Sequence, residues 1–279
     1  MVMPRIDLTN KPIAIAGASS GIGAATARAC ARAGMPVALG ARRTDRLQAL
    51  AAEIQASGGR AIAIECDVTD PDACRRLIDK TERAFGPLFA AFANAGYGYE
   101  GSVLTDDEDQ ALRDIFETNV WGSLHIVRPA IERLRAHNSG GHVLMCSSCL
   151  SKLGVPYYGP YCATKAAQDH LGRALRAELA SEKIAVSTVH PIGTKTEFFD
   201  TAATRSSSGK LAFPTPDAVR QPPEKVARAI VRRLRHPRGG EVWTSLGART
   251  MFAMANAMPG MTDRVLRTAV RKGLKKAER

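Results

Sequence analysis

The feature that most constrains the fold of this chain is a regular alternation between short apolar runs and longer amphipathic stretches. Strands that alternate with helices build βαβ units, and such units form a parallel sheet with helices packed against it. The apolar runs predict strands at residues 12–16, 36–40, 61–66, 88–93, 142–147, 184–190 and 241–244. The amphipathic stretches predict helices at residues 21–33, 44–57, 71–86, 108–136, 159–182 and 223–236. With 279 residues, the chain suits one large α/β domain.

A glycine-rich loop connects the first predicted strand to the first predicted helix. Its spacing, Gly-x-x-x-Gly-x-Gly, is one residue longer than the commonest dinucleotide fingerprint. Glycines allow a tight turn and a close approach of the backbone to a ligand, and the helix N-terminus presents N–H groups to a pyrophosphate. The loop therefore predicts a dinucleotide site formed by Gly17, Ser19, Ser20, Gly21, Ile22 and Gly23.

Tyr161 and Lys165 are expected to lie one turn apart on the predicted helix 159–182, and Ser148 follows a predicted strand. A lysine beside a phenol lowers its pKa from the ordinary value of about 10, which favours acid–base catalysis near neutral pH. Ser148 could then polarise a carbonyl oxygen to which Tyr161 donates a proton. Because a Tyr-x-x-x-Lys pair alone is a weak pattern, this interpretation depends on the other motifs.

Taken together, Gly17–Gly23, Asn94–Ala95–Gly96 and Tyr161–Lys165 with Ser148 resemble the short-chain dehydrogenase/reductase family over roughly residues 11–200. The resemblance implies a single Rossmann-like, doubly wound domain with a seven-stranded parallel sheet. It also implies a bound NAD or NADP and hydride transfer to or from a carbonyl or alcohol carbon. The catalytic residues implied by the resemblance are Ser148, Tyr161, Lys165 and Asn119, the last of which supports a water-linked proton relay behind the lysine.

The residues after the second predicted strand indicate which nicotinamide cofactor is bound. An NAD site has a carboxylate there, which accepts a hydrogen bond from the ribose 2′-hydroxyl. This chain instead has Arg42 and Arg43, and a guanidinium is suited to a 2′-phosphate. The alternative is that these arginines only solvate the start of the next helix, although the helix dipole disfavours cations there. We therefore expect NADP(H) rather than NAD.

The resemblance assigns further cofactor contacts to residues that follow later strands. These residues are Asp67, Val68, Asn94, Ala95, Gly96, Ile192, Thr194 and Thr196, together with Tyr161 and Lys165 beside the nicotinamide ribose. The segment 191–196 departs from the commonest proline–glycine form of the family, because Ile192 stands between the proline and the glycine. The threonines of this segment are also ordinary loop residues, so their assignment depends on the resemblance.

Residues 193–223 form a long stretch rich in serine and proline, which predicts either a lid over the substrate or a tolerated insertion. Aromatic side chains occur at the start of this stretch and near two other motifs. They are Phe198 and Phe199, Tyr97 and Tyr99, and Tyr157 and Tyr158 in the segment 155–158. Each could belong to the core or the surface, but together they predict a pocket for a medium or large apolar carbonyl or alcohol substrate.

Positive charge is concentrated at the C-terminal end of the chain. Residues 1–219 carry 24 basic and 23 acidic side chains, whereas residues 220–279 carry 15 basic and 4 acidic ones. We expect a catalytic domain over residues 1–245 and a basic helical extension over residues 246–279. Residues 261–277 predict an amphipathic helix. Such a helix could pack on its own domain or on another subunit, cover the active-site mouth, bind an acidic partner, or lie on an anionic membrane surface.

Composition excludes several other classes of protein. The chain has no apolar run long enough to span a bilayer and no apolar leader, which predicts a cytoplasmic protein. The histidines and the six cysteines lack the spacing of a metal site or a disulfide framework, so no metal is expected. Cys146 and Cys149 form a Cys-x-x-Cys whose ordinary interpretation is packing and whose alternative is a redox pair. Nothing resembles a module that binds nucleic acid.

The sequence thus predicts an NADP(H)-dependent oxidoreductase that acts on a carbonyl or alcohol group of a small molecule. By the same resemblance, the helices at 108–136 and 159–182 would pair between subunits, which predicts a homodimer or homotetramer. A non-catalytic NADP-binding sensor or scaffold is the alternative from another class. An epimerase or dehydratase with transient oxidation is a third, although it usually needs a longer chain.

Overall fold

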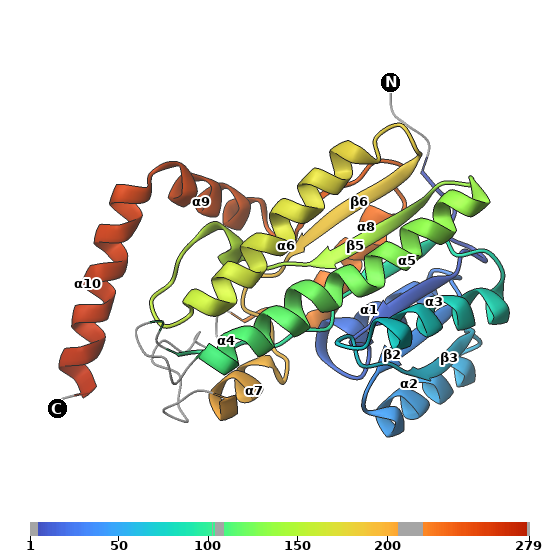
Figure 1. The fold of residues 1–279 in the computed structure, drawn as a ribbon, viewed down its shortest axis with the longest axis horizontal. Coiled ribbons are helices and arrows are strands. Elements are labelled where there is room, and N and C mark those ends of the chain that lie inside the picture. The colour runs from blue at the N-terminus through green and yellow to red at the C-terminus, as the bar shows by residue number, and fades with distance from the viewer. Residues whose placement is uncertain (1–4, 102, 104–108, 206–219, 278–279) are drawn as a thin grey trace.

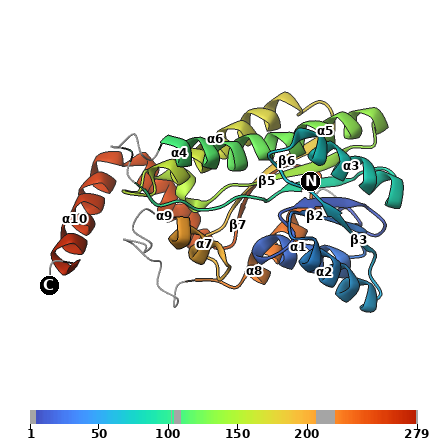
Figure 2. The same cartoon turned by 60° about the horizontal axis from the view of Figure 1, so that its bottom comes forward.

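The computed structural model is a three-layer α/β fold in which a parallel sheet lies between two layers of helices (Figures 1 and 2). The structure describes residues 5–101, 103, 109–205 and 220–277, and side chains as far as residue 271. The strands are β1 (Ile13–Ala16), β2 (Val37–Ala41), β3 (Ala61–Glu65), β4 (Ala90–Ala93), β5 (Gly141–Cys146), β6 (Ile184–His190) and β7 (Gly240–Trp243). They form one seven-stranded sheet in the order β3-β2-β1-β4-β5-β6-β7. The predicted fold class is confirmed, and each predicted strand is present within two residues at either end.

The five inner strands were recognisable because they are buried on both faces. In β1, Ile13 and Ile15 pack into the core formed with α1, α2 and α8, whereas Ala14 and Ala16 pack on the opposite side with α3, α5 and α6. A strand covered on both faces has no polar face, so its sequence is a continuous apolar run. The small alanines allow the helices of the second layer to approach the centre of the sheet closely.

The described residues also form α-helices. They are α1 (Gly21–Arg32), α2 (Thr44–Ala56), α3 (Pro71–Phe85), α4 (Asp109–Phe116), α5 (Gly122–His137), α6 (Gly159–Glu178), α7 (Phe198–Arg205), α8 (Pro223–Leu234), α9 (Leu246–Ala257) and α10 (Pro259–Ala277). A π-helical turn, η2 (Glu117–Trp121), joins α4 to α5, and a 3-10 turn, η3 (Cys149–Lys152), follows β5.

The start of α3 illustrates the local chemistry, since Asp70 accepts a hydrogen bond from the backbone N–H of Asp72 and Pro71 occupies the first helical position.

Two predictions about local structure need correction. The single helix predicted at 108–136 is instead α4, η2 and α5, because the chain makes a π-helical turn at Glu117–Trp121. The predicted irregular stretch at 193–223 contains the helix α7, and Thr194 pairs with Gln221 in an isolated parallel bridge that joins the two ends of the stretch. The part of the predicted lid at 206–219 lies outside the described residues.

The order of the strands determines where a ligand can bind. The chain continues from β1 to β2 on one side of β1, and β4 pairs with β1 on the other side. In an open parallel sheet, this reversal leaves a crevice outside the carboxyl ends of the strands, where ligands bind. The loops that follow β1, β2, β4, β5 and β6 therefore meet at one edge of the sheet.

Candidate active site

A pocket of about 560 Å³ lies at this edge of the sheet. It brings together nearly all the residues predicted to bind a cofactor. Those that line it are Gly17, Ser19, Ser20, Gly21, Ile22, Arg42, Arg43, Asp67, Val68, Asn94, Ala95, Gly96, Tyr161, Lys165, Ile192, Thr194 and Thr196. Ser148 lines the same pocket, whereas Gly23 and Asn119 lie behind its wall.

The glycines of the first loop are required by close contacts in the backbone. Gly17 has a φ of +74°, and a Cβ atom there would lie 2.7 Å from the backbone of Ala95. A Cβ atom on Gly23 would lie 2.1 Å from the carbonyl oxygen of Gly17. The Asn94 amide donates to that same oxygen at 3.1 Å, which ties the loop to the end of β4. The cradle is thus narrow and free of side chains, as close contact with a dinucleotide phosphate requires.

Arg43 lies across the glycine loop. Its guanidinium donates to the hydroxyl oxygens of Ser19 at 3.0 Å and Ser20 at 2.8 Å. It also pairs with Glu197 at 2.8 Å, and Arg46 donates to the other oxygen of the same carboxylate. These hydrogen bonds from Arg46 and Arg43 lower the pKa of Glu197 to about 2. Two arginines therefore surround one ionised carboxylate at this end of the pocket.

Arg42 and Asp67 lie beside this group. The Arg42 guanidinium is 3.7 Å from the Asp67 carboxylate, and its side chain is 71% exposed. Asp67 also accepts hydrogen bonds from the backbone N–H and the hydroxyl of Thr69, which fix the turn after β3. Arg42 thus lines the pocket with an exposed guanidinium, and Asp67 is held in place by the turn.

Ser148, Tyr161 and Lys165 meet at the centre of the pocket, and all three are buried. The Ser148 side chain interacts with the Tyr161 phenol and favours its ionised form, which lowers the pKa of Tyr161. Lys165 lies one turn along α6, with its Nζ atom 5.6 Å from the centroid of the Tyr161 ring, and donates to the carbonyl oxygen of Cys146 at 2.8 Å. The Ser147 hydroxyl donates to the carbonyl oxygen of Lys165 at 2.7 Å and so joins α6 to the end of β5.

Asn119 lies in the π-helical turn η2 and holds the backbone of Tyr97. Its amide donates to the Tyr97 carbonyl oxygen at 3.0 Å, and its side-chain oxygen accepts from the Tyr97 N–H at 3.0 Å. A Cβ atom on the neighbouring Gly96 would lie 2.8 Å from that oxygen, so glycine is needed there. Asn119 thereby fixes the Asn94–Ala95–Gly96 segment from behind.

Gln168, which the sequence analysis missed, connects Lys165 to Asn119. Its side-chain oxygen accepts from Lys165 Nζ at 2.8 Å, and its amide donates to the carbonyl oxygen of Asn119 at 2.7 Å and to the Ser123 hydroxyl at 2.6 Å. The side chain is completely buried. The available signal was a polar residue three positions after Lys165 on the inner face of a helix, where a side chain without a role would be apolar.

Comparison with known proteins identifies the family. The family described as short chain dehydrogenase matches residues 11–206 of the chain. The chain belongs to the short-chain dehydrogenase/reductase family. It is therefore an oxidoreductase that acts on carbonyl or alcohol groups with a nicotinamide dinucleotide.

Individual relatives differ in how much of their length the chain covers. It is 33% identical to the glycine betaine reductase ATRR of Emericella nidulans over 84% of this chain but only 18% of that protein. It is 34% identical to an A-factor type gamma-butyrolactone 1′-reductase of Streptomyces virginiae over 80% of this chain and 87% of that protein. A crystal structure of a short-chain type dehydrogenase/reductase from Mycobacterium marinum is 31% identical, with a TM-score of 0.75 over 85% of this chain and 94% of that one.

The protonation of the site differs from the sequence-based expectation for this short-chain dehydrogenase. Burial raises the pKa of Tyr161 well above its ordinary value, and the interaction with Ser148 opposes this only in part. The expected net lowering of the Tyr161 pKa is therefore wrong for the structure described here, because desolvation dominates. Burial also lowers the pKa of Lys165 to about 8. Both shifts favour the uncharged side chain, and the phenol is protonated at neutral pH.

Aromatic and aliphatic side chains form the wall next to Tyr161. Those that line the pocket are Tyr97, Leu150, Val155, Tyr158, Phe198 and Phe199. The Phe198 ring lies 5.2 Å from the Tyr161 ring, centroid to centroid, and a Cβ atom on Gly98 would lie 2.4 Å from it. Two of the predicted aromatics lie elsewhere, since Tyr157 is exposed and Tyr99 is buried in the core behind the wall. This part of the pocket is mainly apolar, with Arg205 beside Tyr97 at its edge.

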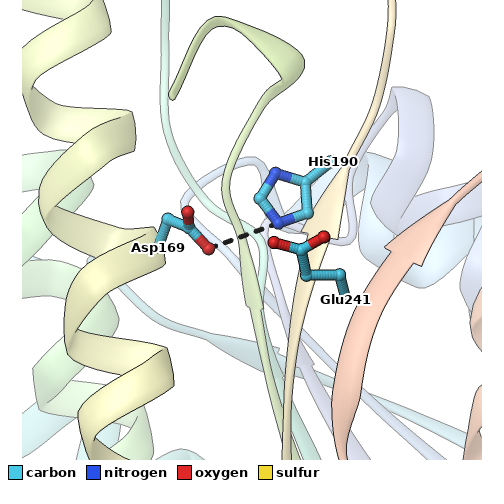
Figure 3. A group of neighbouring side chains, drawn as sticks. All are labelled: Asp169, His190 and Glu241. Atoms are coloured by element: carbon cyan, nitrogen blue, oxygen red, sulfur yellow. Dashed lines mark ion pairs between the residues drawn. The ribbon is translucent and has the colours of Figure 1, made fainter. Parts of the chain in front are cut away.

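A second group of acidic and basic side chains, which the sequence analysis also missed, is joined to the backbone of Ser148. Figure 3 shows three of its members, Asp169, His190 and Glu241. His190 at the end of β6 donates from Nδ1 to the carbonyl oxygen of Ser148 at 3.1 Å, and its Nε2 atom lies 3.4 Å from Asp169 of α6. Lys152 donates to Asp169 at 2.5 Å and to Glu241 of β7 at 3.0 Å. Asp169, His190 and Glu241 have donor atoms close enough to hold a cation, and the Lys152 ammonium lies on the two carboxylates.

The Cys146 and Cys149 pair lies beside the site as buried, free thiols. Burial raises the pKa of both, to about 12 for Cys149. A thiol needs a low pKa to exchange with a disulfide, so these cysteines act here as small packing residues.

Proposed function

We propose that the chain is an NADP(H)-dependent reductase of carbonyl groups on medium or large apolar molecules, working through Ser148, Tyr161 and Lys165. The observation that carries this proposal is the buried Tyr161 side chain, which lines one pocket with Ser148 and Lys165 between a dinucleotide cradle and an apolar wall. A neutral phenol is the form that donates a proton, and a carbonyl oxygen needs one as it becomes an alcohol.

The choice of NADP(H) is supported by the charges at the end of β2. Arg43 is already held against the loop hydroxyls of Ser19 and Ser20, and its present partner is the surface carboxylate of Glu197. A 2′-phosphate placed there would accept two hydrogen bonds from the Arg43 guanidinium. The exposed guanidinium of Arg42 adds a second positive charge. The first three residues after β2 include no carboxylate that could accept from a ribose 2′-hydroxyl, because they are Arg42, Arg43 and Thr44.

The reaction can be followed through the protein's own groups. The bound nicotinamide supplies the hydride for reduction or accepts it in the reverse direction. The Ser148 hydroxyl orients the carbonyl oxygen, and the Tyr161 phenol donates its proton to that oxygen as charge develops on it. Lys165 would hold the nicotinamide ribose and stabilise the phenolate left on Tyr161. The wall at Leu150, Tyr158 and Phe198 would exclude water from the reacting carbon.

Gln168 is proposed as a positioning residue for Lys165. The family resemblance implies a water-linked relay between the lysine and the asparagine carbonyl, but here the Gln168 amide connects Lys165 Nζ with the Asn119 carbonyl oxygen directly. An amide holds the Lys165 ammonium in one orientation, but it does not relay protons as a water molecule does. The proton returned to Tyr161 would therefore arrive from the pocket side.

The test is a spectrophotometric assay with a panel of ketones. Absorbance at about 340 nm follows the oxidation of NADPH or NADH. We expect turnover with aryl or long-chain ketones, faster with NADPH than with NADH, and little with small polar ketones. Binding of NADPH without turnover of any ketone in a broad panel would favour the sensor or scaffold alternative and contradict the proposal.

A further inference from the structure

The last two helices form an arm at the edge of the molecule. Residues of α9 pack against η3 and β7, and α10 packs on α9 and extends away from the α/β body (Figure 1). The family match ends at residue 206, so the arm is a feature of this chain beyond the matched region. No helix in the described part of the chain is both long and apolar enough to cross a bilayer.

The arm carries most of the exposed large apolar side chains of the structure. Nine such side chains are exposed among the described residues, and six of these are on α9, α10 or the junction between them. The six are Leu246, Met251, Met254, Met258, Met261 and Val265. Met254, Met258 and Met261 are 60%, 47% and 52% exposed and follow one another at spacings of four and three residues across the junction. A soluble surface rarely leaves such a series uncovered.

The same arm is strongly cationic. Residues 246–271 contain Arg249, Arg264, Arg267 and Arg271 but only Asp263 as an acidic residue, and Lys272, Lys275 and Lys276 follow in the sequence. Arg264, Arg267 and Arg271 are spaced by three and four residues, so they share one face of α10. Met261 and Val265 lie one turn apart on the adjoining face, next to Arg264. An amphipathic helix with arginines on one face and exposed methionine and valine beside them is typical of a helix that lies in a membrane interface.

We propose that α9 and α10 bind the surface of an anionic lipid membrane, with their exposed methionines in the boundary between headgroups and acyl chains and the arginines on lipid phosphates. Charge complementarity favours this occupant over a second copy, because two arms of the same high positive charge would repel each other. Met side chains adapt to an irregular, fluid surface. This inference does not depend on the proposed reaction, although it adds to it: α9 rests on η3, which carries the pocket residue Leu150.

The test is sedimentation of the full chain with phosphatidylcholine vesicles that contain or lack phosphatidylserine. We expect binding only to the anionic vesicles, weakened by salt. The variant Arg264→Gln/Arg267→Gln/Arg271→Gln should lose affinity on the order of a hundred-fold, and Met254→Ser/Met258→Ser/Met261→Ser should also bind weakly. The matched control is Arg228→Gln/Arg232→Gln/Arg235→Gln, which removes the same charge from α8 and the residue that follows it and should bind as the original protein does. Circular dichroism and the melting temperature check that each variant is folded.

Three results would overturn the proposal. The first is absence of sedimentation with anionic vesicles, and the second is equal sedimentation of the original protein and the α10 arginine variant. The third is a loss of vesicle binding in the α8 control as large as that in the α10 arginine variant. Light scattering without lipid identifies the main rival: a dimer that is lost in the methionine variant, together with no vesicle binding, would assign the arm to a second copy of the chain.

Discussion

Burial acts on Tyr161 and Lys165 in the same sense, because it favours the uncharged form of each side chain. For the phenol this means that the proton is in place before reduction begins. For the lysine, whose pKa falls to about 8, it means that the ammonium is still the main form at neutral pH but loses its proton in mildly alkaline solution. Two hydrogen bonds, to the Cys146 carbonyl oxygen and Gln168, hold that ammonium.

Substitution of Gln168 tests its role in positioning the lysine. Gln168→Leu removes the acceptor for Lys165 and the donor to Asn119, so we expect kcat to fall about ten-fold with little change in the KM for the ketone. Gln168→Glu keeps an acceptor and adds a negative charge, which should raise the pKa of Lys165 and move the alkaline limb of the pH profile upward. If the two variants lose the same activity with unshifted pH profiles, Gln168 has only a structural role.

Arg43 tests the choice of cofactor. Arg43→Ala removes the guanidinium beside Ser19 and Ser20, and the preference for NADPH over NADH in kcat/KM should fall by about ten- to a hundred-fold, mostly through KM. Arg46→Ala is the matched control, because Arg46 shares Glu197 with Arg43 but has no bond to the loop serines in the structure. An unchanged ratio in Arg43→Ala, or an equal loss in the control, would contradict the assignment.

At the scale of elements, the glycine loop between β1 and α1 is shaped by contacts that admit no side chain. Gly23→Ala would place a Cβ atom 2.1 Å from the Gly17 carbonyl oxygen. The backbone of the loop would therefore have to shift, and the cradle for the cofactor phosphates would change shape. We expect the Kd for NADPH to rise at least about ten-fold, measured by nicotinamide fluorescence. Gly260→Ala is the control, since nothing lies within 4 Å of its added Cβ atom. Unchanged NADPH affinity in Gly23→Ala would show that the loop is not the binding element.

The charged group behind Ser148 joins η3, α6, β6 and β7, and its effect should depend on pH. Burial alone would raise the pKa of Asp169, but hydrogen bonds from His190 and Lys152 lower it below its usual range. A carboxyl whose folded pKa is lowered stabilises the protein above its unfolded pKa of about 3.9, and this contribution is lost as the pH falls through the folded value. Asp169→Asn should therefore cost about 3 kcal/mol in the free energy of unfolding at pH values of about 5 to 7.

Urea denaturation at several pH values measures this difference. The gap between the original protein and Asp169→Asn should narrow as the pH falls below about 4, where the carboxyl takes up a proton in the unfolded state while it is still ionised in the folded state. A gap that stays constant across this range would mean that Asp169 contributes through packing rather than through its charge.

The elements differ in how far they could be predicted from the sequence. Strands buried on both faces have continuous apolar sequences, and the loop at Gly17–Gly23 has a characteristic glycine spacing. Both could therefore be predicted from the sequence. The π-helical turn at Glu117–Trp121 was not, because it adds no change of periodicity that a short segment can reveal. The links from Gln168 to Asn119 and from Asp169 to His190 join residues far apart in the chain, and only the fold brings them together.

At the scale of the whole molecule, the basic arm of α9 and α10 and the pocket lie in different places. The pocket lies at the carboxyl edge of the sheet. The basic arm of α9 and α10 lies at the end of the molecule (Figures 1 and 2). The sequence predicted the basic helical extension but represented it as one helix at 261–277, whereas the structure has two helices that meet at Met258. It could not predict the pKa of Tyr161, because the burial that raises it belongs to the assembled pocket.

The central claim is that the Tyr161 phenol donates the proton in a nicotinamide-dependent carbonyl reduction. Tyr161→Phe removes one hydroxyl from a ring that stays packed against Phe198. The most direct measurement is kcat/KM for NADPH-dependent reduction of the best ketone, with NADPH affinity and melting temperature measured on the same sample. The account predicts a fall of about a thousand-fold with both other quantities nearly unchanged. Turnover close to that of the original protein would contradict it.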